Sequence, residues 1–191
     1  SMSKIDFNTP NTHNVTNLLP YTDYRVMISA INTAGDGDKN QIDVQTFSEV
    51  PQQPTGVAAS VLGPKSIKVD WTPPSPRPGV TTYYVKAYEV VQDGSPKFVK
   101  YSNVTGFSTA TTTFVELEEY WNYTFAVVAS TDKGDSPQSD MSTQVTTQQA
   151  APGKVKNFKV ERAGNNYTQM VVSWSIPDLR DQNGVIKGYK I

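Results

Sequence analysis

Apolar and polar residues alternate along several short stretches of this chain. Every second residue is apolar in one such stretch, namely Tyr123, Phe125, Val127 and Ala129. The same period of two leads up to a tryptophan at Ile67, Val69 and Trp71. Because side chains of a strand point alternately to the two faces of a sheet, this period predicts half-buried β-strands.

Turn-forming residues separate these stretches at short intervals. They include Gly63-Pro64, Pro73-Pro74, Asp93-Gly94, Gly106 and Lys133-Gly134. No stretch keeps a helical period over about ten residues. Short alternating stretches between frequent turns predict an all-β fold, an immunoglobulin-like sandwich of two antiparallel sheets.

One segment of the chain occurs twice. Residues 18–37 (LLPYTDYRVMISAINTAGDG) align without a gap with residues 117–136 (LEEYWNYTFAVVASTDKGDS). In this alignment Leu18 matches Leu117 and Tyr24 matches Tyr123. A repeat at the spacing of a whole small domain indicates tandem domains rather than a solenoid.

A second pair of segments fixes the predicted domain division. SIKVDWTPP (66–74) and MVVSWSIPD (170–178) each place an alternating strand before a tryptophan and a proline. The order of the segments then divides the chain into the C-terminal half of one domain (1–49), a complete domain (50–149) and the N-terminal half of another (150–191). We therefore expect a tandem array that is cut within its first and last domains.

These residues together resemble the fibronectin type III domain. The resemblance rests on Pro51, Pro54, Val57, Trp71, Pro73, Pro74, Tyr83, Val85 and the run from Leu117 through Tyr123 to Gly134. It implies two facing sheets and a structural core that includes Trp71, Trp174, Tyr24, Tyr123, Leu18 and Leu117. It also implies that the Tyr123 hydroxyl bonds back to the upstream backbone, an arrangement known as the tyrosine corner.

Composition and charge remove several classes of function. The chain is 37% hydrophobic and carries a net charge of -1, so nothing favours nucleic acid or an anionic membrane as a partner. Its apolar runs fall short of the roughly 18–20 residues that cross a bilayer, so we expect no direct membrane insertion by this segment. The sequence has no cysteine, which excludes disulfides, thiolate metal sites and cysteine catalysis.

The residues that could carry catalysis or bind a metal do not form a recognisable site. His13 is the only histidine and has no nucleophile or metal ligand beside it in the sequence. Residues 36–40 offer oxygens at alternate positions, but a calcium loop would need glycine and glutamate where Gln41 and Phe47 stand. We therefore expect no catalytic residue, no cofactor and no metal.

N-glycosylation is the modification that the sequence suggests. Four Asn-x-Thr sequons begin at Asn14, Asn103, Asn122 and Asn166. In the sandwich interpretation each falls at a strand edge or in a loop, where a glycan can be tolerated. We expect at least two of the four to be glycosylated.

Two further expectations concern contacts between domains. Trp121 stands where the first copy has Thr22, at the end that faces the next domain, so we expect its ring to lie at a domain junction. Contact is expected with residues 152–156 or 176–185. The two half-domains each have an apolar face without an opposing sheet, so we also expect residues 1–49 of one molecule to pair with residues 150–191 of another.

The resemblance extends to the fibronectin type III arrays of receptor-type tyrosine phosphatases and of neogenin-like and sidekick-like adhesion receptors. It implies a non-catalytic extracellular segment of a single-pass cell-surface protein, which acts as a semi-rigid spacer and binds a protein ligand of unknown identity. Catalysis would then reside in a separate domain of the parent. Two alternatives stay open: an intracellular titin-like mechanical scaffold, and a spacer in a secreted carbohydrate-active enzyme.

Overall fold

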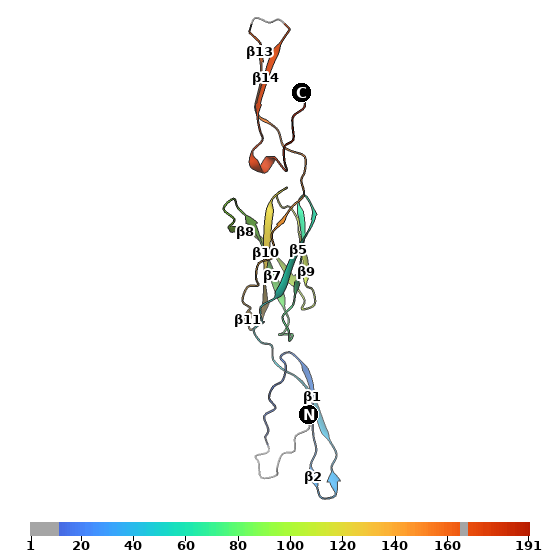
Figure 1. The fold of residues 1–191 in the computed structure, drawn as a ribbon. Coiled ribbons are helices and arrows are strands. Elements are labelled where there is room, and N and C mark those ends of the chain that lie inside the picture. The colour runs from blue at the N-terminus through green and yellow to red at the C-terminus, as the bar shows by residue number, and fades with distance from the viewer. Residues whose placement is uncertain (1–11, 165–167) are drawn as a thin grey trace.

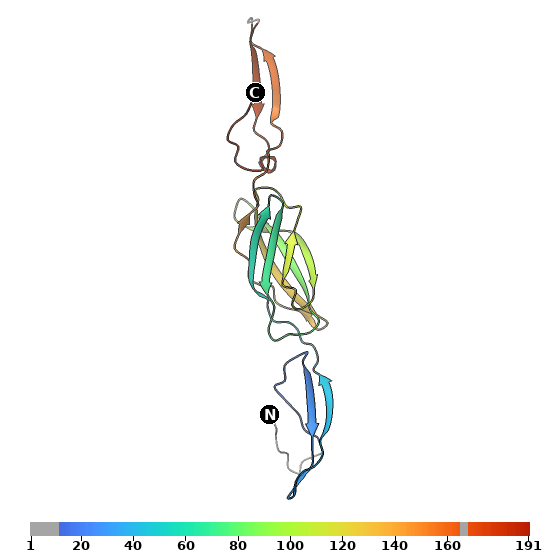
Figure 2. The same ribbon diagram turned by 90° about the vertical axis from the view of Figure 1, so that its right-hand side faces the viewer.

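The chain forms three units in a row. The computed structural model describes residues 12–164 and 168–191. Figure 1 shows a hairpin unit at each end and a β-sandwich between them, and the view at 90° in Figure 2 shows the same linear arrangement. We call them the N-terminal unit (β1 to β4), the middle sandwich (β5 to β12) and the C-terminal unit (β13, β14 and η1). Regular structure is almost entirely β, so the all-β prediction is confirmed.

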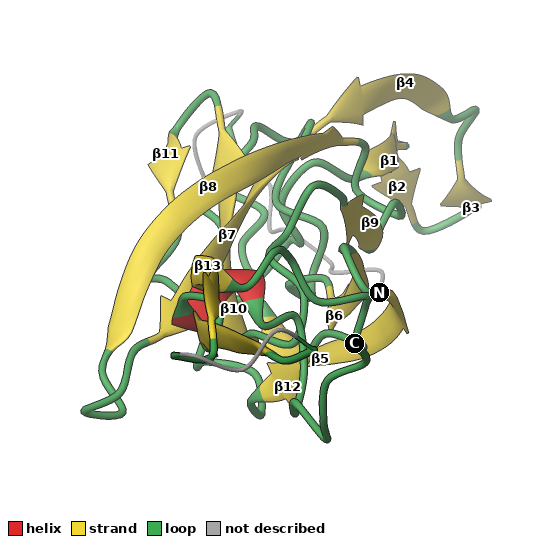
Figure 3. Ribbon diagram, turned by 90° about the horizontal axis from the view of Figure 1, so that it is seen from above, coloured by secondary structure: helices red, strands yellow, loops and turns green. Residues whose placement is uncertain are grey.

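The middle sandwich consists of two antiparallel sheets. One sheet has the order β5-β6-β9, and the other has the order β11-β10-β7-β8 with β12 also paired to β10. The long strand β8 lies at the edge of the larger sheet (Figure 3). The strands are β5 (Thr55–Gly63), β6 (Ser66–Thr72), β7 (Thr82–Val90), β8 (Pro96–Thr105), β9 (Thr111–Phe114), β10 (Asn122–Thr131), β11 (Gly134–Asp135) and β12 (Val145–Thr146).

The core lies between the two sheets and contains the residues whose alternation predicted the strands. Trp71 of β6 is 5% exposed and meets Tyr83 of β7 edge to face, with ring centroids 5.1 Å apart. Tyr123 of β10 and Leu117 belong to the same buried cluster. Both sheets therefore contribute large side chains to one core, as a sandwich requires.

An extended serine-containing segment, residues 136–142, runs along the free side of β10. Three serines donate their backbone N–H to carbonyls of β10 and accept β10 N–H groups with Oγ: Ser136, Ser139 and Ser142. Their spacing of three residues matches a polyproline-like conformation better than the period of two of a strand. Hydroxyl groups thus satisfy a sheet edge that would otherwise present unpaired backbone groups.

The two end units are short antiparallel hairpins with exposed apolar residues. In the N-terminal unit, β1 (Asp23–Ile28) pairs with β4 (Asn40–Gln45), and β2 (Ile31–Asn32) pairs with β3 (Gly35–Asp36). In the C-terminal unit, β13 (Lys156–Arg162) pairs with β14 (Met170–Ser175), and the chain continues into the 3₁₀ helix η1 (Leu179–Asp181). Ile28 is 67% exposed, whereas its aligned residue Val127 is fully buried. Val127 faces the β5-β6-β9 sheet, and the described residues place no such sheet over β1.

Within the described ranges, no helix has the length and apolar character needed to cross a lipid bilayer.

Candidate interdomain junctions

Two corners of the same construction precede the junctions between units. The first corner comprises residues 18–24, and the second corner comprises residues 117–123. In the first, the hydroxyl of Tyr24 accepts a hydrogen bond from Leu19 N at 2.8 Å. In the second, the hydroxyl of Tyr123 accepts one from Glu118 N at 3.0 Å. Each tyrosine therefore fixes the turn that leads into its own strand.

A threonine that directly follows a later strand closes each corner. In the first corner Thr46 Oγ1 donates to Leu19 O, and in the second Thr147 Oγ1 donates to Glu118 O, both at 2.7 Å. The corners need such support because Tyr21 and Tyr120 adopt φ angles of 44° and 50°. A positive φ is unfavourable for a bulky residue and persists only where surrounding contacts impose it.

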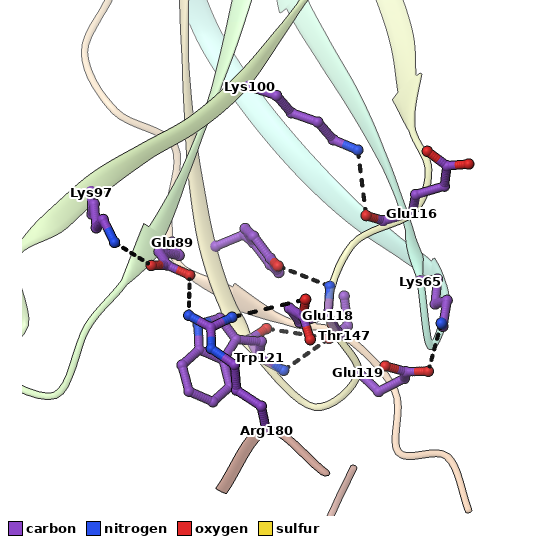
Figure 4. Close-up of polar contacts among 11 residues, drawn as sticks. Lys65, Glu89, Lys97, Lys100, Glu116, Glu118, Glu119, Trp121, Thr147 and Arg180 are labelled. Carbon is purple, nitrogen blue, oxygen red and sulfur yellow. Dashed lines mark hydrogen bonds and ion pairs between the residues drawn. The ribbon is translucent and has the colours of Figure 1, made fainter.

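Arg180 of η1 is the central residue of the junction between the middle sandwich and the C-terminal unit (Figure 4). Its guanidinium carbon lies 4.5 Å from the centroid of the Trp121 ring. Its Nη2 donates to Glu89 Oε2 at 2.9 Å, and its Nη1 lies 3.9 Å from Glu118 Oε1. One side chain of the C-terminal unit thus contacts an aromatic face and two carboxylates of the middle sandwich.

Glu89 is the buried carboxylate that pairs with Arg180 at this junction. The carboxylate of Glu89 lies near the end of β7, and only 7% of its side chain is exposed. Burial raises the pKa of this carboxyl, but the hydrogen bond and charge of Arg180, assisted by Lys97, outweigh burial and hold the pKa below its ordinary value. Loss of Arg180 would therefore leave a buried carboxylate with a weaker partner, since Lys97 Nζ lies 3.5 Å away.

Hydrogen bonds also join the linker to the C-terminal unit. Ala150 N donates to Asn183 O at 2.8 Å, and Asn183 Nδ2 donates to Ala151 O at 2.8 Å. A Cβ atom added at Gly184 would come within 2.5 Å of Gln149 Oε1, so the two segments approach too closely for a side chain there. These contacts restrict the linker and favour one orientation of the units.

The indole of Trp121 contributes through its ring. Its Nε1 is buried and has no hydrogen-bond partner in the described part of the protein. The ring instead lines a groove between the units together with Ile176, Leu179 and Val185. Apolar burial and the cation–π contact with Arg180 therefore account for its position.

The junction between the N-terminal unit and the middle sandwich also contains an arginine over an aromatic ring. The guanidinium carbon of Arg77 lies 4.9 Å from the centroid of the Tyr21 ring. Glu49 N donates to Pro78 O at 2.8 Å, and Thr131 Oγ1 donates to Glu49 O at 2.8 Å. Arg77 forms no ion pair with any residue that the structure describes.

The two arginines hold equivalent positions in the sequence. Arg77 follows Trp71 by six residues, and Arg180 follows Trp174 by six residues. Each lies after the tryptophan strand of its own unit and contacts an aromatic ring in the corner of the preceding unit. A cation–π contact of this kind contributes about 0.5–2 kcal/mol, depending on its exposure to solvent.

The structure places the predicted site residues in different environments. Trp121 contacts the stretch 176–185 through Arg180, whereas Trp174 is half-buried and meets Tyr189 of its own unit at 5.1 Å between ring centroids. Leu18 is 40% exposed although its aligned residue Leu117 is 4% exposed. Asn14 and Asn103 are exposed and Asn122 is half-buried. Asn166 lies outside the described residues.

Sequence reasoning missed Arg77, Arg180 and Glu89. The equal spacing of the two arginines from a strand tryptophan was a visible signal for the first two. Glu89 shares the parity of the buried residues of β7, so the period of two in that strand was a signal for its inward position. Among residues 12–164 and 168–191, no group of three or more His, Asp or Glu side chains is arranged to hold a metal ion.

Comparisons with known proteins agree with this architecture. The sequence profile of the fibronectin type III domain matches residues 52–145. Receptor-type tyrosine-protein phosphatase F of Bos taurus is 31% identical over 192 residues, covering 98% of this chain and 10% of the relative. Cell adhesion molecule Dscam1 of Drosophila melanogaster is 32% identical over 142 residues, covering 74% of this chain and 7% of the relative. The chain thus spans at most about a tenth of the length of these curated relatives.

A solved structure shows the same fold. Domains d3-d4 of the extracellular region of rat CD45 superpose with a TM-score of 0.52 and 22% sequence identity, covering 77% of this chain and 75% of that one. The predicted resemblance is confirmed by the profile match and by this shared sandwich. The chain therefore belongs to the fibronectin type III family, through the domain formed by residues 52–145.

Proposed function

We propose that this chain is a non-catalytic extracellular segment of a single-pass cell-surface receptor or adhesion protein. In this role it acts as a semi-rigid spacer and presents its loops and sheet faces to a protein ligand. The similarity to a receptor-type phosphatase and to a cell adhesion molecule supports the receptor assignment. The lack of cysteine and the single exposed histidine are consistent with a segment that binds rather than catalyses.

We further propose a receptor-type tyrosine phosphatase as the parent. The supporting observation is the 31% identity to receptor-type tyrosine-protein phosphatase F, which extends over 98% of this chain. Phosphatase activity would then belong to another part of the parent protein. The sequence that follows this segment tests the proposal directly, because it should contain a membrane span and then a phosphatase domain.

The observation that carries the spacer role is the repeated arginine–aromatic contact. Arg77 and Arg180 each connect one unit to the corner of the unit before it, and hydrogen bonds restrict both linkers. Contacts on both sides of a short linker oppose the free rotation that a flexible chain would allow. The three units therefore hold a linear arrangement (Figure 1).

Small-angle X-ray scattering of the complete chain tests this rigidity. We expect a rod-like distance distribution for the unmodified chain and a broader, shorter one for the double variant Arg77→Ala/Arg180→Ala. Arg25→Ala is the matched control, because Arg25 pairs with Asp43 inside the N-terminal unit and touches neither junction. Equal scattering from all three proteins would show that the arginines do not restrict the units.

Antibody staining tests the extracellular assignment separately. An antibody raised against the middle sandwich should stain intact cells that express the parent protein. Staining that appears only after permeabilisation would overturn this assignment and favour an intracellular scaffold.

A further inference from the structure

The outer face of β7 and β8 is unusually aromatic. Four rings share this face, namely Tyr84, Tyr88, Phe98 and Tyr101, as the pairing of the two strands shows. Phe98 and Tyr101 are 51% and 60% exposed, and Phe98 meets Tyr88 edge to face at 5.9 Å between ring centroids. These partly exposed rings form apolar surface on an otherwise polar sheet face, and such surface can be covered by a bound group.

Asn103 lies within this aromatic face. It is paired with Tyr84 across the β7–β8 ladder, so the two side chains point the same way at about 4.5–5.5 Å between Cβ atoms. Tyr101 lies two residues before Asn103 on the same face of β8. The sequon therefore places the Asn103 amide on the same face as two neighbouring tyrosines.

The geometry of this sequon suits modification. Val104 packs against the core, so Asn103 and Thr105 on either side of it both point outward. Both residues are exposed, and β8 is an edge strand, so no neighbouring strand crowds them. A glycan at Asn103 would extend into solvent without disturbing any hydrogen bond of the sheet.

Asn122 shows the opposite arrangement. Its Oδ1 accepts a hydrogen bond from Thr146 Oγ1 at 2.6 Å, in the register where β10 pairs with β12. Thr124, which completes that sequon, is 6% exposed and donates its hydroxyl to Ser142 O at 2.8 Å. The Thr124 hydroxyl, which the sequon requires, is thus inaccessible in the folded sandwich, and the Asn122 side chain is held against the closing strand.

We propose that Asn103 is N-glycosylated, that the first sugars of its glycan pack on Tyr84 and Tyr101, and that Asn122 stays unmodified in the folded protein. In the reaction, Nδ2 of Asn103 forms a bond to C1 of the first N-acetylglucosamine of a lipid-linked oligosaccharide. The bond from C1 to the diphosphate oxygen breaks, the lipid diphosphate leaves with the electron pair, and Nδ2 loses one proton. The inference deepens the proposed function and rests on its extracellular assignment.

The aromatic face gives the glycan a role in stability. Pyranose rings carry C–H groups on their faces, and these pack on aromatic rings through dispersion and removal of apolar surface from water. Tyr101 supplies an exposed ring next to the attachment point, and Tyr84 supplies a half-buried one. The glycan therefore covers the apolar surface that the sheet leaves open.

Glycopeptide mapping of the complete chain, secreted from mammalian cells behind an added signal peptide, tests the attachment site. We expect a glycan at Asn103 and none at Asn122 in the secreted protein. Thr105→Ala should remove the glycan at Asn103, and the matched variant Thr105→Ser should retain it. An unmodified Asn103 or a glycosylated Asn122 would overturn the proposal. Either failure would leave the extracellular assignment intact, because the added signal peptide supplies secretion and antibody staining judges that assignment.

Thermal unfolding tests the packing of sugar on tyrosine. In an Asn14→Gln/Asn166→Gln background, which leaves Asn103 as the expected acceptor, we compare protein from mammalian cells with the same sequence from bacteria. The glycosylated protein should melt roughly 2–4 °C higher. In Tyr84→Ser/Tyr101→Ser the difference should vanish while the glycan remains attached. The same difference with and without the two rings would overturn the packing.

Discussion

The first and second corners contain the same hydrogen bonds but differ in burial. Tyr24 and Tyr123 each accept a backbone N–H five residues upstream, at 2.8 and 3.0 Å. The threonines that close the corners donate at the same distance of 2.7 Å. Yet Tyr123 is 1% exposed and Leu117 is 4% exposed, whereas Tyr24 is half-buried and Leu18 is 40% exposed.

This difference separates the local hydrogen bonds of the tyrosine corner from the burial of its apolar residues. The corner forms from residues close together in sequence and one threonine that comes directly after a later strand of the same unit, so it forms in both units. Burial of its apolar residues requires the opposing β5-β6-β9 sheet, which covers only the second corner within the described residues. Equivalent substitutions in the two corners should therefore differ in effect.

Removal of the core tryptophan should have the largest effect. Trp71→Ala should lower the free energy of unfolding of the middle sandwich by about 3–5 kcal/mol, out of about 5–15 kcal/mol for a domain, because it leaves a cavity against Tyr83. Trp174→Ala, in the C-terminal unit, should leave that transition unchanged. Chemical denaturation followed by circular dichroism measures both. A Trp71→Ala midpoint equal to that of the unmodified protein would contradict a core role for Trp71.

Removal of the tyrosine hydroxyl should have an intermediate effect. Tyr123→Phe leaves the Glu118 N–H without its acceptor in a part-buried corner, so it should lower the unfolding free energy of the middle sandwich by about 1–2 kcal/mol. Tyr24→Phe removes the same bond in an exposed corner, where water can replace the hydroxyl, and should change stability by less than about 0.5 kcal/mol. Thermal unfolding of the two variants compares them. Equal losses would show that burial does not determine the contribution of the hydroxyl.

Acid should loosen the Arg180 junction more than the Arg77 junction. The pKa of Glu89 is lowered in the folded protein, so its ion pair with Arg180 stabilises the junction fully above the ordinary glutamate pKa of 4.5. This stabilisation is lost progressively as the pH falls from that value through the lower folded-state pKa. Arg180 is 48% exposed, so the loss should be below about 1 kcal/mol. The Arg77 contact has no carboxylate partner in the described chain. The hydrogen bond with Ser48 lowers the pKa of Asp132 at this junction, but Asp132 is fully exposed, so its protonation should have the smaller effect.

Distances between spin labels placed on either side of each junction, measured at pH 7 and pH 3.5, test this difference. The distribution should broaden at acid pH more across the Arg180 junction than across the Arg77 junction. Glu89→Gln should abolish that pH response, since it removes the titrating group. A response of equal size in Glu89→Gln, or at both junctions, would assign the change to another cause.

The weakest effect should be association between molecules. Both end units leave apolar residues exposed, so we propose that residues 1–49 of one copy pair with 150–191 of another, in the way that β10 and β6 pack in the middle sandwich. Without a covalent link, ordering costs should limit this to a Kd of roughly 0.1–1 mM. Analytical ultracentrifugation should show a concentration-dependent mass that Ile28→Lys abolishes, whereas Lys68→Ala, on the middle sandwich, should preserve it. A constant monomer mass at high concentration would contradict the pairing.

The sequence was sufficient to predict much of the fold. The period of two in β6 and β10 marked buried positions of the middle sandwich, and the repeated segment located both corners. Trp121 was singled out because it is a large residue at a position that holds threonine in the first copy. Arg180, which covers the Trp121 ring, could not be paired with Trp121 from the sequence, since the two residues lie far apart in the chain.

What the sequence alone determined about this protein is its local structure: the strands, the turns and the tyrosine corners. These depend on residues that are neighbours in the chain, or that recur at fixed spacing, so alternation and repetition reveal them. The tertiary structure decided which apolar faces are covered, that Glu89 is buried beside Arg180, and that Asn103 lies among aromatic rings whereas Asn122 is engaged by Thr146. Burial and ion pairing depend on which surface lies opposite, and that is set only when distant segments pack together.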